Sequence, residues 1–301
     1  MRKILILLLI IILTGCSSRE EVLPADIDES AELEEDEWLE EEENSQEHEG
    51  DTPTKPKEEE GIGYQDLKDR ILDKYQGIAP SEWGENLEGV ISEIQTDEKI
   101  VALTFDACDG SPNSYDKKLI DFLIQEEVPA TLFIGGQWIK ENQAIFMELA
   151  GNPLFEIANH GYHHKPLSVT GERAYNIEGT KSVEDAFDEI YKNQMLIKEL
   201  TGSYPKYFRS GTAYYDDVAV EIIQDLDLKA VNYNVLGDAG GTFNKKQIVK
   251  AFETAKEGSI FLFHMNQPHS EICKGVQEGV RLLKERGFSF VQLGEYDEFL
   301  K

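Results

Sequence analysis

Short apolar runs alternate with longer amphipathic stretches through roughly the last two thirds of the 301-residue chain, and this alternation limits the possible folds more than any other feature. The runs are rich in β-branched and aromatic residues and are apolar on both faces, as in a covered parallel sheet. Strands that alternate with helices predict an α/β fold whose parallel sheet is open or closed into a barrel. Seven runs are predicted to be strands: 100–105, 130–134, 155–158, 207–208, 230–235, 260–263 and 288–293.

The stretches between these runs carry apolar residues three or four positions apart, which favours helices. A further amphipathic stretch, 64–75, precedes the first run. We expect it to pack on the barrel as part of an N-terminal segment, 61–97. The predicted helices that follow are 115–126, 138–150, 183–200, 218–226, 248–255 and 276–286.

Polar or titratable residues stand at the carboxyl ends of five predicted strands, namely Asp106, His160, Arg209, Asp238 and His264. In an α/β barrel these ends converge on one face, which holds the active site. Each residue by itself could be a turn former or a helix cap. Five together, with an arginine and two histidines among them, predict a functional site on that face.

Five of the six histidines lie in two short clusters. His160 and His164 are four positions apart, so a helix or a tight turn would direct both imidazoles toward one metal ion. His163 offers a second partner for His160 at a spacing of three. His264 is a candidate acid or base because its pKa lies near neutrality, whereas His269 is assigned no role.

The chain begins with two basic residues and an apolar run, 4–13, followed by Thr-Gly-Cys. Ten apolar residues are too few to span a bilayer core about 30 Å thick, so the pattern favours a signal peptide over 1–15. The ending resembles the bacterial lipoprotein signal, which implies a lipid on Cys16. An ordinary secretory peptide is the alternative.

Residues 17–60 contain 20 acidic and 3 basic residues. This charge and the lack of apolar residues predict a disordered tether over 16–60, with an acidic docking tail as the alternative. Residues 61–301 still carry a net charge of −15. That balance argues against nucleic acid as a partner, because no basic surplus exists to neutralise phosphates. We expect membrane attachment only through the lipid.

Five ordered motifs, "LTFDACDG", "NHGYHH", "FRSGTAYYD", "GDAGG" and "FLFHMN", cover a chain segment that begins near residue 98 and runs to the end. In this order and spacing the segment resembles the polysaccharide deacetylases, which are the carbohydrate esterases of family four. The resemblance implies a distorted (β/α) barrel with about seven parallel strands over 98–301. It also implies a metal-dependent hydrolase that removes acetyl groups from N-acetylated, or in some members O-acetylated, polysaccharide.

The resemblance assigns a role to each matching residue. Asp106 would be the general base that activates water, and Arg209 would pair with it and keep it ionised. His160 and His164 would bind a divalent metal. His264 would be the general acid to the leaving amine, with Asp238 orienting its imidazole.

Two departures from the family pattern stand out. The family's second Asp of T-F-D-D, a metal ligand, is here Ala107, so Asp109 or Cys108 could supply the third ligand. Two histidines with waters, or Asp106 itself, could complete the site instead. We expect Asp109 in this role and zinc as the metal, with cobalt, nickel or manganese as alternatives. The stretch "RSGTAYYD" also lacks the family's proline and early aromatic residue, which bears on the backbone N–H that stabilises the oxyanion.

The expected protein is therefore extracytoplasmic, anchored by lipid to a bacterial cell membrane, and acts on an acetylated polysaccharide such as peptidoglycan. An exported polysaccharide fits equally, and no protein partner is inferred. A weak or inactive relative that binds glycan is the main alternative, and an amidase acting on another linkage is a third. Cys108 and Cys273 are compatible with one disulfide or with two free thiols.

Overall fold

The computed structural model describes residues 63–300 except 109 and 113. The expected signal peptide 1–15, lipidation at Cys16, tether 16–60 and metal ligand Asp109 all lie outside the described residues. Among the residues that are described, no helix combines the length and the apolar character needed to cross a membrane.

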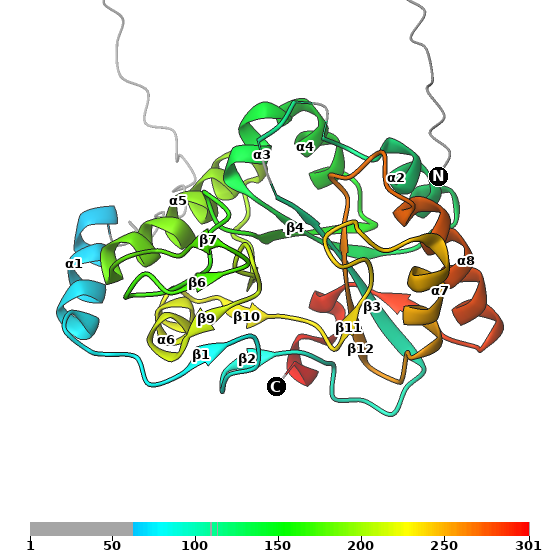
Figure 1. Cartoon of the computed structure of the whole chain (residues 1–301). Helices are drawn as coiled ribbons and strands as arrows, with labels where there is room; N and C mark the ends of the chain where they lie inside the picture. Colours follow the sequence, from blue (N-terminus) through cyan, green and yellow to red (C-terminus); the bar gives the residue numbers. More distant parts are fainter. Residues whose placement is uncertain (1–62, 109, 113, 301) are drawn as a thin grey trace, which may run out of the picture. The chain divides into compact units, whose positions relative to one another are not determined.

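A sheet of nine strands forms the centre of the fold, and every strand pair in it is parallel (Figure 1). The predicted α/β class with a parallel, barrel-like sheet is thus confirmed. The strand order is β11-β12-β3-β4-β5-β8-β10-β2, and β13 pairs with the beginning of β3. The strands are β2 (Val90–Ile91), β3 (Ile100–Ala107), β4 (Ala130–Ile134), β5 (Phe155–Asn159), β8 (Tyr207–Phe208), β10 (Lys229–Val231), β11 (Val235–Leu236), β12 (Ser259–His264) and β13 (Ser289–Val291).

The sheet curls because of a short connection between strands that are far apart in the strand order. β10 lies near one end of this order and β11 at the other, yet only residues 232–234 separate them. Such a link spans at most about 14 Å, so the two ends of the sheet must approach each other. The predicted single strand 230–235 is wrong for this reason: it is two strands joined by the closing link.

Helices cover the outside of the sheet (Figure 1). The predicted helix 138–150 is two helices, because Asn142 leaves helical geometry at φ −129° and its side-chain amide bonds the carbonyl of Trp138 at 3.1 Å. The helices are α1 (Tyr64–Tyr75), α2 (Lys117–Gln125), α3 (Gly136–Glu141), α4 (Gln143–Ala150), α5 (Val183–Thr201), α6 (Asp217–Asp225), α7 (Lys245–Glu253) and α8 (Ile272–Glu285), followed by a 3₁₀ segment, η1 (Leu293–Phe299).

Side chains alternate strictly along β3, the central strand. Leu103, Phe105 and Ala107 belong to the core between the sheet and the helices. Residues between them therefore face the interior of the curled sheet, since successive side chains point to opposite faces. Thr104 and Asp106 are accordingly the polar side chains that β3 contributes to the interior.

The segment before β3 lies against the barrel. In α1, the buried Lys68 forms ion pairs with Glu184 and Asp188 of α5, at 2.7 and 3.3 Å. After α1, strand β1 (Trp83–Gly84) pairs antiparallel with β9 (Tyr215–Asp216), and β2 extends the main sheet beside β10. The segment thus contributes strands as well as the predicted helix.

Candidate active site

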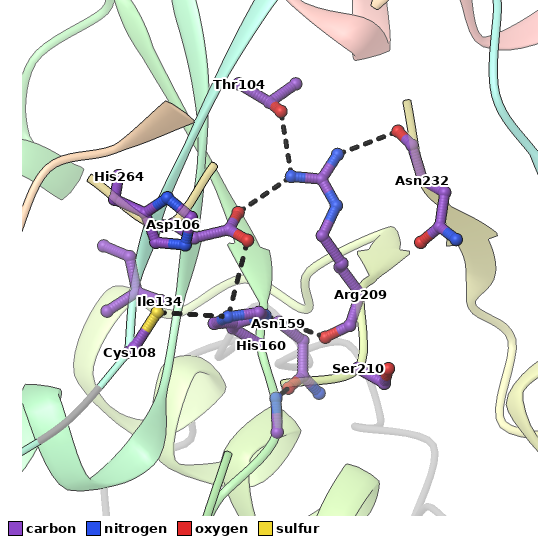
Figure 2. Close-up of polar contacts among 12 residues, drawn as sticks. Thr104, Asp106, Cys108, Ile134, Asn159, His160, Arg209, Ser210, Asn232 and His264 are labelled. Atoms are coloured by element: carbon purple, nitrogen blue, oxygen red, sulfur yellow. Dashed lines mark hydrogen bonds and ion pairs between the residues drawn. The ribbon is translucent and has the colours of Figure 1, made fainter. Parts of the chain in front are cut away.

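The polar residues predicted at the strand ends meet at one edge of the curled sheet, and Figure 2 shows four of them, Asp106, His160, Arg209 and His264. Asp106 near the end of β3 and His264 at the end of β12 are direct register partners on neighbouring strands. His160 follows β5, Arg209 follows β8, and Asp238 comes shortly after β11. The topology thus gathers five residues that lie up to 158 positions apart in the chain.

Arg209 and Asp106 form a buried ion pair. Arg209 Nη1 donates to Asp106 Oδ1 at 2.8 Å and to the Thr104 hydroxyl at 2.9 Å. The other guanidinium nitrogens donate to backbone carbonyls of 231 and 232, and the guanidinium lies 4.0 Å from the centre of the Phe133 ring. Arg209 is fully buried and makes four hydrogen bonds, one of them within the ion pair, which is the condition under which a buried charge is tolerated.

This arrangement keeps Asp106 ionised. Burial works against the charged form, but the Arg209 guanidinium and the nearby imidazoles of His160 and His264 outweigh it and lower the pKa of Asp106. A carboxylate that accepts a charge-assisted hydrogen bond is also held in a fixed orientation. The second carboxylate oxygen, Oδ2, remains free of Arg209 and lies 3.5 Å from His160 Nε2.

His160 is oriented by its backbone contact. Its Nδ1 lies 3.0 Å from the carbonyl oxygen of Arg209. A carbonyl can only accept, so Nδ1 carries a proton, and Nε2 is the nitrogen that presents a lone pair when the imidazole is neutral. That Nε2 lies 3.7 Å from Cys108 Sγ. A backbone carbonyl that holds the other ring nitrogen in this way is typical of histidines that bind metals.

Cys108, His160 and His164 bring one ligand atom each within 4.8 Å of one another. The rings of His160 and His164 meet edge to face, with centroids 5.0 Å apart. Burial disfavours the Cys108 thiolate, but the imidazoles of His164, His264 and His160 outweigh it and place the pKa of Cys108 well below its usual value. A thiolate with two imidazoles is a donor set that fits a divalent metal, zinc above all.

The alternation in β3 explains why Cys108 and not Ala107 joins this cluster. Ala107 is fully buried on the helix-facing side, next to Phe105 and Ile134. The position after it returns to the interior side, where Asp106 also lies. A carboxylate at 107 would point away from the histidines.

The loop that carries the histidines is not helical. Gly161 and His164 adopt left-handed backbone conformations, with φ of 76° and 58°. The two imidazoles nevertheless converge, as the tight-turn alternative predicted. His163 is exposed and its ring packs against Tyr162 instead, so it lies outside the cluster.

Glu189 of α5 shapes this loop and was missed in the sequence. It is 2% exposed, and its carboxylate accepts the backbone N–H groups of His163 at 2.9 and 3.0 Å and of Lys165 at 3.2 Å. A Cβ on Gly161 would lie 2.5 Å from Glu189 Oε1, so glycine is required beside it. Nothing in the helical pattern of α5 distinguishes this glutamate from a surface one.

Asp238 holds His264 at two points. Its carboxylate accepts the backbone N–H of His264 at 2.6 Å and lies 2.9 Å from His264 Nδ1. Burial lowers the basicity of His264, but the neighbouring Cys108 and Asp238 outweigh this and raise its pKa well above the usual value. These contacts favour the protonated form of the imidazole and fix its Nδ1 on Asp238.

A cavity of about 350 Å³ opens onto these groups, and Asp106 and His264 are both in its lining. Thr212 also lines it, and its buried hydroxyl has no hydrogen-bond partner among the described residues. Thr212 was not singled out in the sequence, because its only signal is its position three residues after Arg209. Cys273 is a free thiol in the structure, as is Cys108, and His269 lies in a turn after β12.

The sequence profile described as polysaccharide deacetylase matches residues 93–231, which include Asp106, Cys108, both clustered histidines and Arg209. The comparisons support the polysaccharide deacetylase family. A bifunctional xylanase/deacetylase of Pseudobutyrivibrio xylanivorans is 28% identical over 67% of this chain and 31% of its own length. The peptidoglycan-N-acetylmuramic acid deacetylase PdaA of Bacillus subtilis is 23% identical over 72% of this chain and 80% of its own length.

Solved structures of polysaccharide deacetylases share this fold. One is a family four pseudoenzyme from Bacillus anthracis, with a TM-score of 0.59 at 21% identity, over 77% of this chain and 81% of that chain. Another is a family four acetyl xylan esterase from Clostridium thermocellum in complex with a cobalt ion, with a TM-score of 0.55 at 24% identity, over 66% and 90%. These likenesses show the fold of this chain, and one of the similar structures is a pseudoenzyme.

Replacing Ala107 by Asp should not create a metal ligand. The new carboxylate would be buried in the apolar core beside Phe105, so we expect a loss of about 3 kcal/mol or more in the free energy of unfolding. Cys108→Asp is the matched control, because it places the same carboxylate on the interior side. Urea unfolding and zinc content would be measured for both; a stable Ala107→Asp protein with increased zinc content would contradict the alternation argument.

Glu189→Ala should destabilise the histidine loop. Removing the carboxylate leaves the N–H groups of His163 and Lys165 without their acceptor, which costs on the order of 2 kcal/mol. Glu189→Gln keeps an acceptor oxygen and should lose less. Urea unfolding would be paired with a cobalt titration that reports on His164; equal stability and cobalt affinity in Glu189→Ala and the unmodified protein would rule out this positioning role.

Proposed function

We propose that this protein is a metal-dependent hydrolase that removes acetyl groups from an N-acetylated or O-acetylated polysaccharide outside the cell. One observation carries the proposal: Asp106 and His264, register partners on adjacent strands, line the same cavity beside the Cys108, His160 and His164 cluster. A base, an acid and a metal-binding set at one cavity are what hydrolysis of an unactivated acyl bond needs.

Cys108, His160 and His164 would hold the metal, with Asp109 as the alternative third ligand. A bound divalent cation would polarise the acetyl carbonyl and lower the pKa of the attacking water. The cobalt-bound acetyl xylan esterase among the similar structures agrees with a divalent metal in this family.

The remaining steps belong to this chain's own side chains. Asp106, held ionised by Arg209, accepts the proton of the attacking water at Oδ2. The unpartnered hydroxyl of Thr212 is free to donate to the developing oxyanion, since stabilising groups of this kind act where charge develops. His264, protonated through its pairing with Asp238, donates from Nε2 to the leaving nitrogen or oxygen of the sugar.

Peptidoglycan is the proposed substrate, and the membrane is the proposed location. The relatives are named as a peptidoglycan-N-acetylmuramic acid deacetylase and a xylanase/deacetylase, and these activities favour an acetylated wall polymer. The lipoprotein-like ending at Cys16 would keep the enzyme within reach of such a polymer. The chain spans only 31% of the length of the xylanase/deacetylase, so the full activity of that protein is not proposed for this chain.

Glycan binding without turnover is the second candidate function. It is favoured by the motif departure at Ala107, where the family pattern has a metal-ligating Asp. Metal binding separates the two candidates, since an inactive glycan binder has no need of the ligand set. A third candidate is a different hydrolysis on the same fold, such as amide cleavage at another linkage. The identity of the released product distinguishes it from deacetylation.

Metal content is the first test. We expect the purified protein to contain close to one zinc per chain after incubation with the metal, and His160→Ala to lose it, since the imidazole is one of three ligands. Elemental analysis would be run beside His163→Ala, whose side chain lies outside the cluster and should retain zinc. No zinc, cobalt, nickel or manganese in the unmodified protein would favour the glycan-binding function.

Acetate release tests the chemistry. The unmodified protein should release acetate from peptidoglycan or from N-acetylglucosamine oligomers, and Asp106→Asn should lower the turnover number at least about 100-fold, because an amide cannot accept the proton. Circular dichroism would establish that Asp106→Asn is folded. Full activity in that variant would exclude Asp106 as the base.

A further inference from the structure

An exposed aromatic hairpin borders the mouth of the active-site cavity. Strands β6 (Arg173–Ala174) and β7 (Ile177–Glu178) pair across a turn whose tip is Tyr175 and Asn176. Both tip residues are left-handed, with φ of 50° and 66°. Bulky aromatic residues rarely adopt that conformation, and such outliers gather at functional sites.

Tyr175 is held in place although it is 68% exposed. Its hydroxyl donates to Glu85 Oε1 at 2.9 Å, and its ring meets Tyr214 edge to face, with centroids 5.6 Å apart. The residue lines the cavity together with Ile177 and Leu236, which are two more of the exposed large apolar side chains. A fixed, exposed ring at a cavity mouth is suited to packing against the apolar face of a sugar.

Glu85 comes from the N-terminal segment, just after β1, and is tied to the reaction centre. The buried Asn232 side chain donates to its backbone carbonyl at 2.6 Å, and the backbone carbonyl of Asn232 accepts from Arg209. The Glu85 carboxylate receives the hydroxyls of Tyr175 and Tyr233, at 2.9 and 3.4 Å. The Glu85 carboxylate is thus held on two tyrosines that line the cavity. Asn232 connects the Glu85 backbone to Arg209.

The Glu85 carboxylate accepts hydrogen bonds only from neutral groups among the described residues. Among the described residues that line the cavity there is no lysine or arginine. The hairpin's own cation, Arg173, pairs with Glu178 at 3.1 Å and donates to the carbonyl of Asn176. A sugar unit that places a carboxylate against Glu85 would be repelled by this unneutralised charge, whereas hydroxyl and amide donors of a neutral sugar can approach it.

We propose that Tyr175 and Glu85 form a sugar-binding subsite beside the reaction centre, which takes an uncharged hexosamine unit and disfavours a unit bearing a carboxylate. The subsite deepens the proposed deacetylase function and rests on it for the identity of the reacting sugar. It makes the N-terminal segment part of substrate recognition, because Glu85 comes from that segment.

Two matched probes test the subsite: a pentamer of N-acetylglucosamine, which is uncharged, and a hyaluronan oligosaccharide, in which the same sugar alternates with glucuronate. Binding would be measured by titration calorimetry in the Asp106→Asn background, so that the probes stay intact. We expect the pentamer to bind, and Tyr175→Ala to weaken its binding at least tenfold. Tyr175→Phe, which keeps the ring, should stay within about threefold.

Two further variants complete the design. Tyr204→Ala removes an exposed tyrosine that does not line this cavity and should leave pentamer binding unchanged. Glu85→Gln keeps acceptor capacity without charge, so it should retain the pentamer and bind hyaluronan at least fivefold more tightly. No pentamer binding, unchanged binding in Tyr175→Ala, or unchanged hyaluronan binding in Glu85→Gln would each overturn the proposal.

Acetate release by proteins that keep Asp106 distinguishes failure of the subsite from failure of the proposed deacetylase function. If the pentamer is deacetylated with the same KM in Tyr175→Ala, the subsite is wrong and the proposed function stands. If pentamer binding depends on Tyr175 but no acetate appears from any acetylated glycan, the proposed function is wrong and the subsite stands as part of a glycan-binding protein.

Discussion

The buried pair of Arg209 and Asp106 is the contact on which the rest of the site depends. A guanidinium with no exposure can be kept only if each of its hydrogen-bonding directions finds a partner, and loss of a partner would leave an uncompensated buried charge, which costs about 3–5 kcal/mol. The partners come from β3, from the last residue of β10 and from the short link that closes the curled sheet. Closure of the curled sheet and ionisation of Asp106 therefore depend on the same set of contacts.

Much of the fold was predictable because buried parallel strands and amphipathic helices leave strong periodic patterns. The predicted helix and strand bounds were wrong where a single side chain interrupts the periodic pattern around it. Asn142 divides a helical pattern, and Asn232 leaves the strand pattern because its amide bonds the carbonyls of Glu85 and Ala213. The strand-end residues could be found from the sequence, since topology alone brings them together. Glu189 and Glu85 could not, because their importance depends on which loops fold against them.

The third metal-ligand position shows how a single step of strand register decides chemistry. Comparing motifs residue by residue points to Ala107 as a loss, because alanine has no donor atom. In the structure, β3 continues through Ala107, so the site-facing positions are 106 and 108 and the cluster gains a thiolate. A thiolate is a softer donor than a carboxylate and shifts the preference toward zinc over harder cations. The departure from the family motif thus changes the kind of site more than it removes one.

A thiolate at Cys108 would be exposed to oxidation outside the cytoplasm, where free thiols are oxidised. The histidines that would share a metal with Cys108 also keep its pKa low, and thiolates are the form that oxidants attack. Cys273 is likewise a free thiol and is not bonded to Cys108, so a disulfide does not protect the latter among the described residues. In the proposed function, donation of the sulfur lone pair to a metal would protect it instead. Metal binding would then preserve Cys108 as well as complete the site, and loss of the metal would expose the one ligand that cannot be restored by rebinding once it has been over-oxidised.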